Sequence, residues 1–341
     1  MLRYVIFAIT TMTLAVVTGC ATSTKDGDAA STAKSAGGSM AASAVQPDWL
    51  TGESREYPRQ KYLTAHGTGG NADEAIGDAQ KKLTALFEVD NTEASFTPLT
   101  LPVPGLNQEL AALQKDINVA TVWRNSGTGR YHALAFAPRK PAETYLQRKV
   151  NEIDTTTGQT LDQAKTAKDD IAKLGLLARA LHLQSTRNQL QASLQQADLT
   201  GKGVAPRWRE KKLNANASKQ LKRLKIMPVG HDKYPLIDSL TSGLATAGVS
   251  SAKEKNAEYL IRATLTISVS LPKSGQTQGQ GNLQLALVDK ASGSSVGTRQ
   301  WAITVDAQDA IAAERHVLEQ ADFFIKKDME NFLLDVAMQN P

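Results

Sequence analysis

The chain has 341 residues, of which 39 are Lys or Arg and 34 are Asp or Glu, so its formal net charge at pH 7 is +5. This length allows two ordinary domains, each with its own hydrophobic core. Because Cys20 is the only cysteine, no intramolecular disulfide can form, which excludes a disulfide-stabilised fold.

The first residues have the layout of a secretory signal peptide. Arg3 precedes an apolar run over residues 4–17, and a Thr-Gly pair then leads to Cys20. The run is shorter than the about 20 apolar residues that a membrane-spanning helix needs. We therefore predict that residues 1–19 are a cleaved signal peptide. An ordinary signal peptide with a chance cysteine at the cut is the alternative.

The sequence that ends at Cys20 resembles the lipobox of bacterial lipoproteins, in which the cysteine thiol receives a diacylglycerol and the cysteine becomes the new N-terminus. Two or three acyl chains, diacylglycerol plus palmitate, hold a protein stably on a membrane. In Gram-negative lipoproteins, a residue such as Ala21 after the cysteine favours the outer membrane. The resemblance implies lipidation at Cys20 and a location on the outer membrane, facing the periplasm, where no nucleic acid is available as a partner.

Residues 20–45 consist mostly of Ala, Ser, Thr, Gly and Lys, and this composition predicts a flexible tether. Residues 46–154 follow as a first α+β domain. A strand over residues 61–67 is expected to lead into a helix capped by Asn71, with Glu74 in the capping-box position. A proline-containing loop, a short helix at 108–115 and a hairpin built around Trp123 complete this domain.

From Ala142 the apolar spacing is helical, and polar residues at 155–158 predict a break in it. Residues 155–200 are thus a helical insertion, either a helical hairpin or one long broken helix. Residues 202–225 contain nine Lys or Arg and a single Glu. This run of charge predicts a boundary between domains, with a basic linker over residues 201–220.

Residues 221–341 predict a second domain with the order β-α-β-β-β-α. A short strand ends in Pro228, and an alternating strand covers residues 261–269. A Gly/Gln-rich turn is expected at 275–280, before two more strands and a final helix. The predicted fold class is α+β: two small domains, each with helices packed on a short, mostly antiparallel sheet, and a helical insertion between them.

Two family resemblances have residues to support them. A Pro-x-Trp start, Gly67-x-Gly69 and the hairpin with Trp123 resemble the lipoprotein family typified by a twenty-kilodalton surface antigen, and the N-terminal domain of flagellar assembly protein T. The strand ending in Pro228 and the turn at 289–293 resemble a group that contains the curli secretion lipoprotein, the lipoprotein activator of a penicillin-binding protein and the N-terminal domain of TolB. The second resemblance implies partner binding rather than chemistry.

The residues that could carry chemistry do not form a catalytic or metal-binding pattern. Gly67-x-Gly69 between a strand and a helix fits a dinucleotide fingerprint, but we favour a tight turn because no second parallel strand follows the helix. His66 and His132 could face one another across strands, without an acid or cysteine close by. We therefore expect no enzyme, no metal and no cofactor.

Two groups of residues are candidates for partner binding. Arg262, Thr264 and Thr266 are expected on an open sheet face. Arg207, Trp208 and Arg209 combine charge with an aromatic ring, and form either a solvated linker or a contact with anionic lipid or the cell wall. We expect a non-catalytic outer-membrane lipoprotein that acts as an envelope assembly or scaffold factor through a periplasmic or outer-membrane protein partner. The alternatives are a regulator of peptidoglycan synthesis that binds a penicillin-binding protein, and a subunit of a secretion or flagellar-associated assembly.

Overall fold

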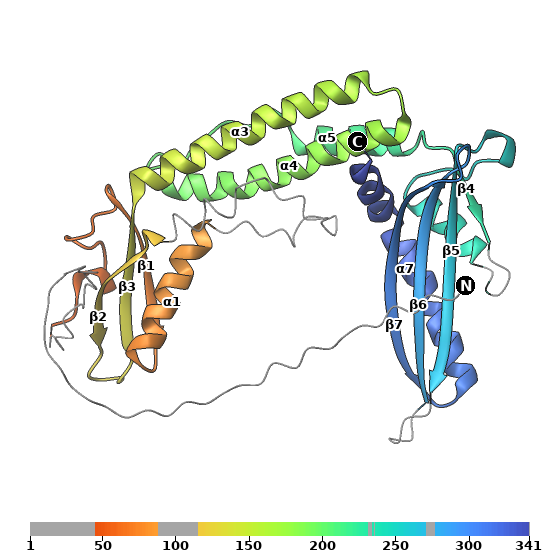
Figure 1. Ribbon diagram of the computed structural model, residues 1–341. Coiled ribbons are helices and arrows are strands. Elements are labelled where there is room, and N and C mark those ends of the chain that lie inside the picture. Colours follow the sequence, from red (N-terminus) through yellow and green to blue (C-terminus); the bar gives the residue numbers. More distant parts are fainter. Residues whose placement is uncertain (1–44, 88–114, 231–233, 235, 271–276, 341) are drawn as a thin grey trace, which may run out of the picture. The chain divides into compact units, whose positions relative to one another are not determined.

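The computed structural model describes residues 45–87, 115–230, 234, 236–270 and 277–340, all of which belong to one compact unit, residues 39–341 (Figure 1). The predicted signal peptide and lipidation at Cys20, nearly all of the predicted tether, the proline-containing segment and nearly all of the predicted helix at 108–115 lie outside the described residues. The chain is α+β, as predicted. It has a three-stranded sheet, a four-stranded sheet and packed helices, with a helical hairpin between the sheets in the sequence.

The first sheet has the order β1-β3-β2 and is antiparallel throughout, with β1 at Tyr62–Gly69, β2 at Asn118–Arg124 and β3 at Tyr131–Pro138. Helix α1 (Ala72–Thr84) packs on one face, next to the short 3-10 helix η2 (Ala85–Phe87). Another 3-10 helix, η1 (Asp48–Leu50), precedes the sheet.

The predicted start of α1 is confirmed. The Glu74 backbone N–H donates to the Asn71 side-chain oxygen at 2.8 Å, and the Glu74 carboxylate accepts from the Gly70 N–H at 2.8 Å. Glycine is needed just before this cap because the helix lies on the strand. A Cβ on Gly67 would lie 2.2 Å from the Ala79 backbone nitrogen. The glycines therefore permit close packing of strand and helix.

Helices α3 (Arg139–Thr166) and α4 (Asp170–Ala197) form an antiparallel hairpin (Figure 1). The predicted break at 155–158 is wrong, because α3 continues through it. The hydroxyls of Thr155, Thr156 and Thr157 donate to the carbonyls four residues earlier, at 2.8–3.0 Å, and so remain compatible with the helix.

Helix α5 (Glu210–Leu221) lies where the sequence predicted a basic linker. Leu213, Ala217 and Leu221 are buried at helical spacing, while Lys211, Lys212 and Lys219 are exposed. The sequence analysis missed this helix because charged and polar residues separate its few apolar ones. The domain boundary itself stays a prediction.

The second sheet follows the predicted order β-α-β-β-β-α. Its elements are β4 (Ile226–Val229), α6 (Ile237–Thr246), η3 (Glu254–Asn256), β5 (Tyr259–Ser270), β6 (Thr277–Asp289), β7 (Ser295–Ala307) and α7 (Ala310–Gln339). The strand order is β4-β5-β6-β7, with β4 parallel to β5 and the other pairs antiparallel.

The predicted Gly/Gln-rich turn at 275–280 is wrong from residue 277 on, because these residues already belong to β6. The glycines serve packing instead. A Cβ on Gly281 would lie 2.5 Å from the Val317 side chain of α7, and one on Gly279 would lie 3.0 Å from the Ala313 carbonyl oxygen. Helix α7 therefore lies directly on the glycines of the central strand.

Helix α4 contributes to two hydrophobic cores. Ile171 and Leu174 in its first half pack with α7 and the second sheet. Leu190 and Leu194 in its second half pack with α1 and the first sheet. A Cβ on Gly175 would lie 2.1 Å from the Ala337 carbonyl oxygen, so α4 and α7 approach one another at backbone distance.

Candidate functional site

Strand β5 has an open edge over most of its length. Its neighbour β4 has four residues and pairs only with Tyr259–Arg262. Over residues 263–270, no strand of the described chain pairs with β5 on that side (Figure 1). These eight residues include no charged residue, proline or glycine. Charged residues and proline commonly protect a free edge in soluble proteins, so this edge is a candidate for pairing with another strand.

The predicted binding residues of this sheet lie where the sequence placed them. Arg262, Thr264 and Thr266 are exposed, while Ile261 and Leu265 are buried against the helices. The polar face extends across the sheet, since Thr264 pairs with Gln284 and that residue with Gln300. The other exposed members of this face are Ser268, Ser270, Gln280, Asn282, Thr298, Ala302, Thr304 and the charged Asp306.

The opposite edge strand, β7, differs because its side chains are tied to α7. Arg299 pairs with Asp335 at 3.3 Å, and the Trp301 indole N–H donates to Asp328 at 3.1 Å. Burial raises the pKa of Asp335 to about 6 although Arg299 opposes the shift. An irregularity in the pairing with β6 lies between Leu287 and Val288. Charge and irregular pairing both protect an edge, so β5 is the better candidate for partner binding.

The second predicted group of binding residues, at 207–209, lies at a separate site. Arg207, Trp208 and Arg209 line a pocket of about 840 Å³ together with residues of α3, α4 and α5. No residue of either sheet lines it. The charged run at 202–225 already contained the lining cations Lys212, Lys219 and Arg223, but the sequence analysis missed Lys173. Lys173 lies near the start of α4, and only the fold brings it to this pocket.

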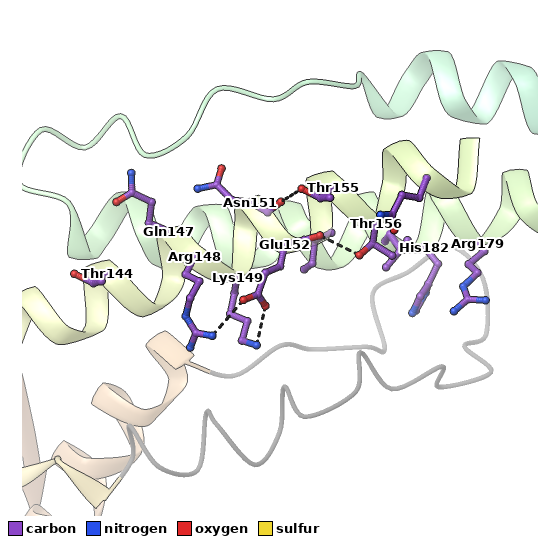
Figure 2. Close-up of a pocket in the computed structure, with 13 residues that line it drawn as sticks. Thr144, Gln147, Arg148, Lys149, Asn151, Glu152, Thr155, Thr156, Arg179 and His182 are labelled. Carbon is purple, nitrogen blue, oxygen red and sulfur yellow. Dashed lines mark hydrogen bonds and ion pairs between the residues drawn. The ribbon is translucent and has the colours of Figure 1, made fainter. Parts of the chain in front are cut away.

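A further pocket of about 890 Å³ lies on the surface of the α3–α4 hairpin (Figure 2). Its one acidic residue, Glu152, lies 3.2 Å from Arg148 and 2.9 Å from Lys149. Figure 2 also labels Arg179 and His182 of α4, which line the same pocket. Because two of its three Lys or Arg side chains pair with Glu152, this pocket offers a ligand less positive charge than the pocket at Trp208 does.

His66 and His132 face one another across β1 and β3. Their rings stack with centroids 5.2 Å apart, and His66 Nε2 lies 3.0 Å from His132 Nδ1. Trp49 lies 5.5 Å from His66 and Trp123 lies 5.5 Å from His132, centroid to centroid, so four rings form a row. Burial lowers the pKa of both histidines, and in His66 the neighbouring imidazole adds to the effect. Within the described residues, no group of three or more His, Cys, Asp or Glu side chains could hold a metal ion.

No protein-family model and no curated protein matches the sequence. Among solved structures, a secreted protein of Helicobacter pylori is 12% identical, and the match covers 82% of this chain and 99% of that chain with a TM-score of 0.33. A Xanthomonas campestris protein of the family-model DUF330 is 15% identical over 35% of this chain and 78% of that chain, with a TM-score of 0.26. A minor lipoprotein from Acinetobacter baumannii is 15% identical over 34% of this chain and 93% of that chain, with a TM-score of 0.25.

At these identities and TM-scores, the similarities carry no argument about function. The resemblances to the twenty-kilodalton-antigen family and to the curli-secretion group stay predictions. In the part of the chain that the structure describes, no helix combines the length and the hydropathy that a membrane span requires.

Proposed function

We propose that this protein is a lipid-anchored, non-catalytic scaffold of the bacterial envelope that captures a protein partner by strand addition at β5. The observation that supports the proposal is the open, uncharged edge over residues 263–270 beside the short strand β4. An added strand gains backbone hydrogen bonds along the edge, and its alternate side chains set the specificity.

The open edge also defines what the partner must offer. Eight residues of β-strand extend over roughly 26 Å, so the partner needs an extended segment of about that length. Its side chains on one face would lie beside Thr264, Thr266 and Ser268, which are polar and uncharged. The partner strand should therefore be rich in small polar or β-branched residues on that face.

The proposal includes a lipid anchor on Cys20. Replacing Cys20 with Ser should leave unacylated precursor and remove the protein from the outer-membrane fraction. Mature protein recovered in that fraction without lipid would contradict the anchoring part of the proposal.

Two matched pairs of lysine substitutions test the binding edge. Thr264→Lys with Thr266→Lys adds charge at β5, and Gln300→Lys with Ala302→Lys adds the same charge in the same cross-strand rows at β7. Both pairs are at exposed positions, where substitutions usually change stability by within about 0.5 kcal/mol. Circular dichroism should therefore be unchanged in both.

Capture of the partner from crosslinked envelopes should fall only in the β5 variant. Equal capture by both variants, or a loss confined to the β7 variant, would contradict strand addition at β5. The captured protein also decides between the roles, since a penicillin-binding protein would indicate regulation of cell-wall synthesis, and a channel or flagellar component would indicate that assembly.

A further inference from the structure

The pocket that contains Trp208 has the size of a ligand site. It measures about 840 Å³ and lies between α3, α4 and α5, where small-molecule pockets of roughly 300–1,000 Å³ are common. Trp208 is half-buried, and a Cβ on Gly158 of α3 would lie 3.3 Å from its indole ring. The glycine therefore allows the segment before α5 to lie against α3, which forms one wall of the pocket.

The charges that line this pocket have almost one sign. Asp162 is the only acidic residue among them, and it already pairs with Lys165 at 2.7 Å. The other cationic side chains form no ion pair with a described residue. They are Lys173, Arg207, Arg209, Lys212, Lys219 and Arg223.

The absence of pairing among these six described cations contrasts with the ion pairs along α3. Elsewhere on α3, Lys140 pairs with Glu143 and Arg148 with Glu152, both at 3.2 Å. The six cations come from α4, from α5, from the segment between these helices and from Arg223 just after α5. A concave surface lined by one sign of charge concentrates the field and attracts counter-ions.

The type of cation and the start of α5 indicate the chemistry of the ligand. Three of the six are arginines, whose planar guanidinium groups bind phosphate and carboxylate oxygens in pairs. Arg209 is the N-cap of α5 and makes no capping hydrogen bond with its side chain. The first backbone N–H groups of the helix thus have no capping side chain, and Glu210 in the first turn offsets part of the positive potential there.

We infer that this pocket binds a ligand that carries two or three phosphate groups. A phosphate monoester has a charge of about −1.5 to −2 at pH 7, so two or three of them balance most of the six cations, whereas phosphodiesters, with one negative charge each, balance fewer. A single inorganic phosphate leaves most of the pocket volume and most of the charge unmatched. The ligand is either a soluble polyphosphate compound or the headgroup of a lipid with several phosphates. This site is independent of strand addition at β5.

Isothermal titration calorimetry on the full-length chain in non-ionic detergent tests the inference. The probes are tripolyphosphate, inorganic phosphate, and detergent micelles that contain either cardiolipin, which has two phosphates, or phosphatidylcholine, which is zwitterionic. Tripolyphosphate or cardiolipin should bind more tightly than inorganic phosphate and phosphatidylcholine. The affinity should weaken as salt is raised. Whichever of the two binds more tightly identifies the source of the phosphates.

A pair of charge-matched variants separates a site from general attraction. Arg207→Gln with Arg209→Gln removes two cations from the pocket and should weaken binding roughly 25-fold, about 5-fold for each charge. Lys202→Gln with Lys211→Gln removes the same charge from exposed positions that do not line the pocket, and should leave the affinity close to wild type. The inference is overturned if neither polyanion binds, if inorganic phosphate binds as tightly as tripolyphosphate, or if both variants weaken binding equally.

Discussion

A buried ion pair inside the α3–α4 hairpin gives the sharpest test of how this fold is stabilised. Asp154 is 0% exposed and Arg187 is 1% exposed, and Arg187 Nε lies 3.3 Å from Asp154 Oδ1. The guanidinium also donates to the Val204 carbonyl at 2.8 Å. Gln184 is close to the same carboxylate oxygen, at 3.4 Å. The cluster therefore joins α3, α4 and the segment that follows α4.

Removing one partner leaves the other charge buried without compensation. Asp154→Ala should lower the free energy of unfolding by about 3–5 kcal/mol. Replacing both residues by apolar ones of similar volume, Asp154→Leu with Arg187→Met, removes the charge as well as the pair. The free energy of unfolding of that double variant should be much closer to the wild-type value. It should be lower by about 1 kcal/mol because the hydrogen bond to the Val204 carbonyl is lost.

Urea denaturation followed by far-ultraviolet circular dichroism measures the difference. With a slope of about 3 kcal/mol/M, the midpoint for Asp154→Ala should fall by roughly 1–1.7 M. The double variant should recover most of this loss. If Asp154→Ala leaves the midpoint unchanged, or if the double variant is as unstable as the single one, the reasoning about an uncompensated buried charge is wrong.

Three further perturbations test other parts of the fold. Burial lowers the pKa of His66 and His132 below the unfolded value of 6.5, so the unfolded state binds more protons and the free energy of unfolding should fall as the pH drops below 6.5. In the double variant His66→Gln with His132→Gln, the denaturation midpoint should depend less on pH over this range. Gly175→Ala places a methyl group against the Ala337 carbonyl oxygen and should cost about 1–3 kcal/mol in a thermal melt, whereas an unchanged melting temperature would contradict the close approach of α4 and α7. Asn71→Ala should cost about 1 kcal/mol and Asn71→Gly only a few tenths, and equal losses would show that the cap does not stabilise α1.

The parts of the fold that the sequence predicted well are those with a local signal. The cap at Asn71 depends on residues three positions apart, and the alternation of Ile261, Arg262 and Thr264 depends on neighbours in one strand. Apolar spacing alone located the last helix. Such patterns are confirmed because the same residues determine both the local conformation and the buried face.

The features that the sequence did not predict depend on distant partners. Asp154 and Arg187 are polar residues that fit a solvent-exposed face, and only their pairing across the hairpin explains their burial. Gly281 is typical of a turn, yet its position against Val317 requires a glycine within a strand. In the basic pocket, the charged run at 202–225 was visible, but Lys173 joins it only through the packing of α4 and α5.

Site-specific photocrosslinking in living cells tests the central proposal most directly. Ser268 of β5 and Thr304 of β7 are both exposed and pair with the same residue, Gln280, from opposite sides. A photoreactive phenylalanine analogue at each position therefore samples the same row of the polar face at opposite edges. Strand addition at β5 predicts a crosslinked product of one defined mass from position 268 and none from position 304. Crosslinking from position 304 alone, or equally from both positions, would contradict it.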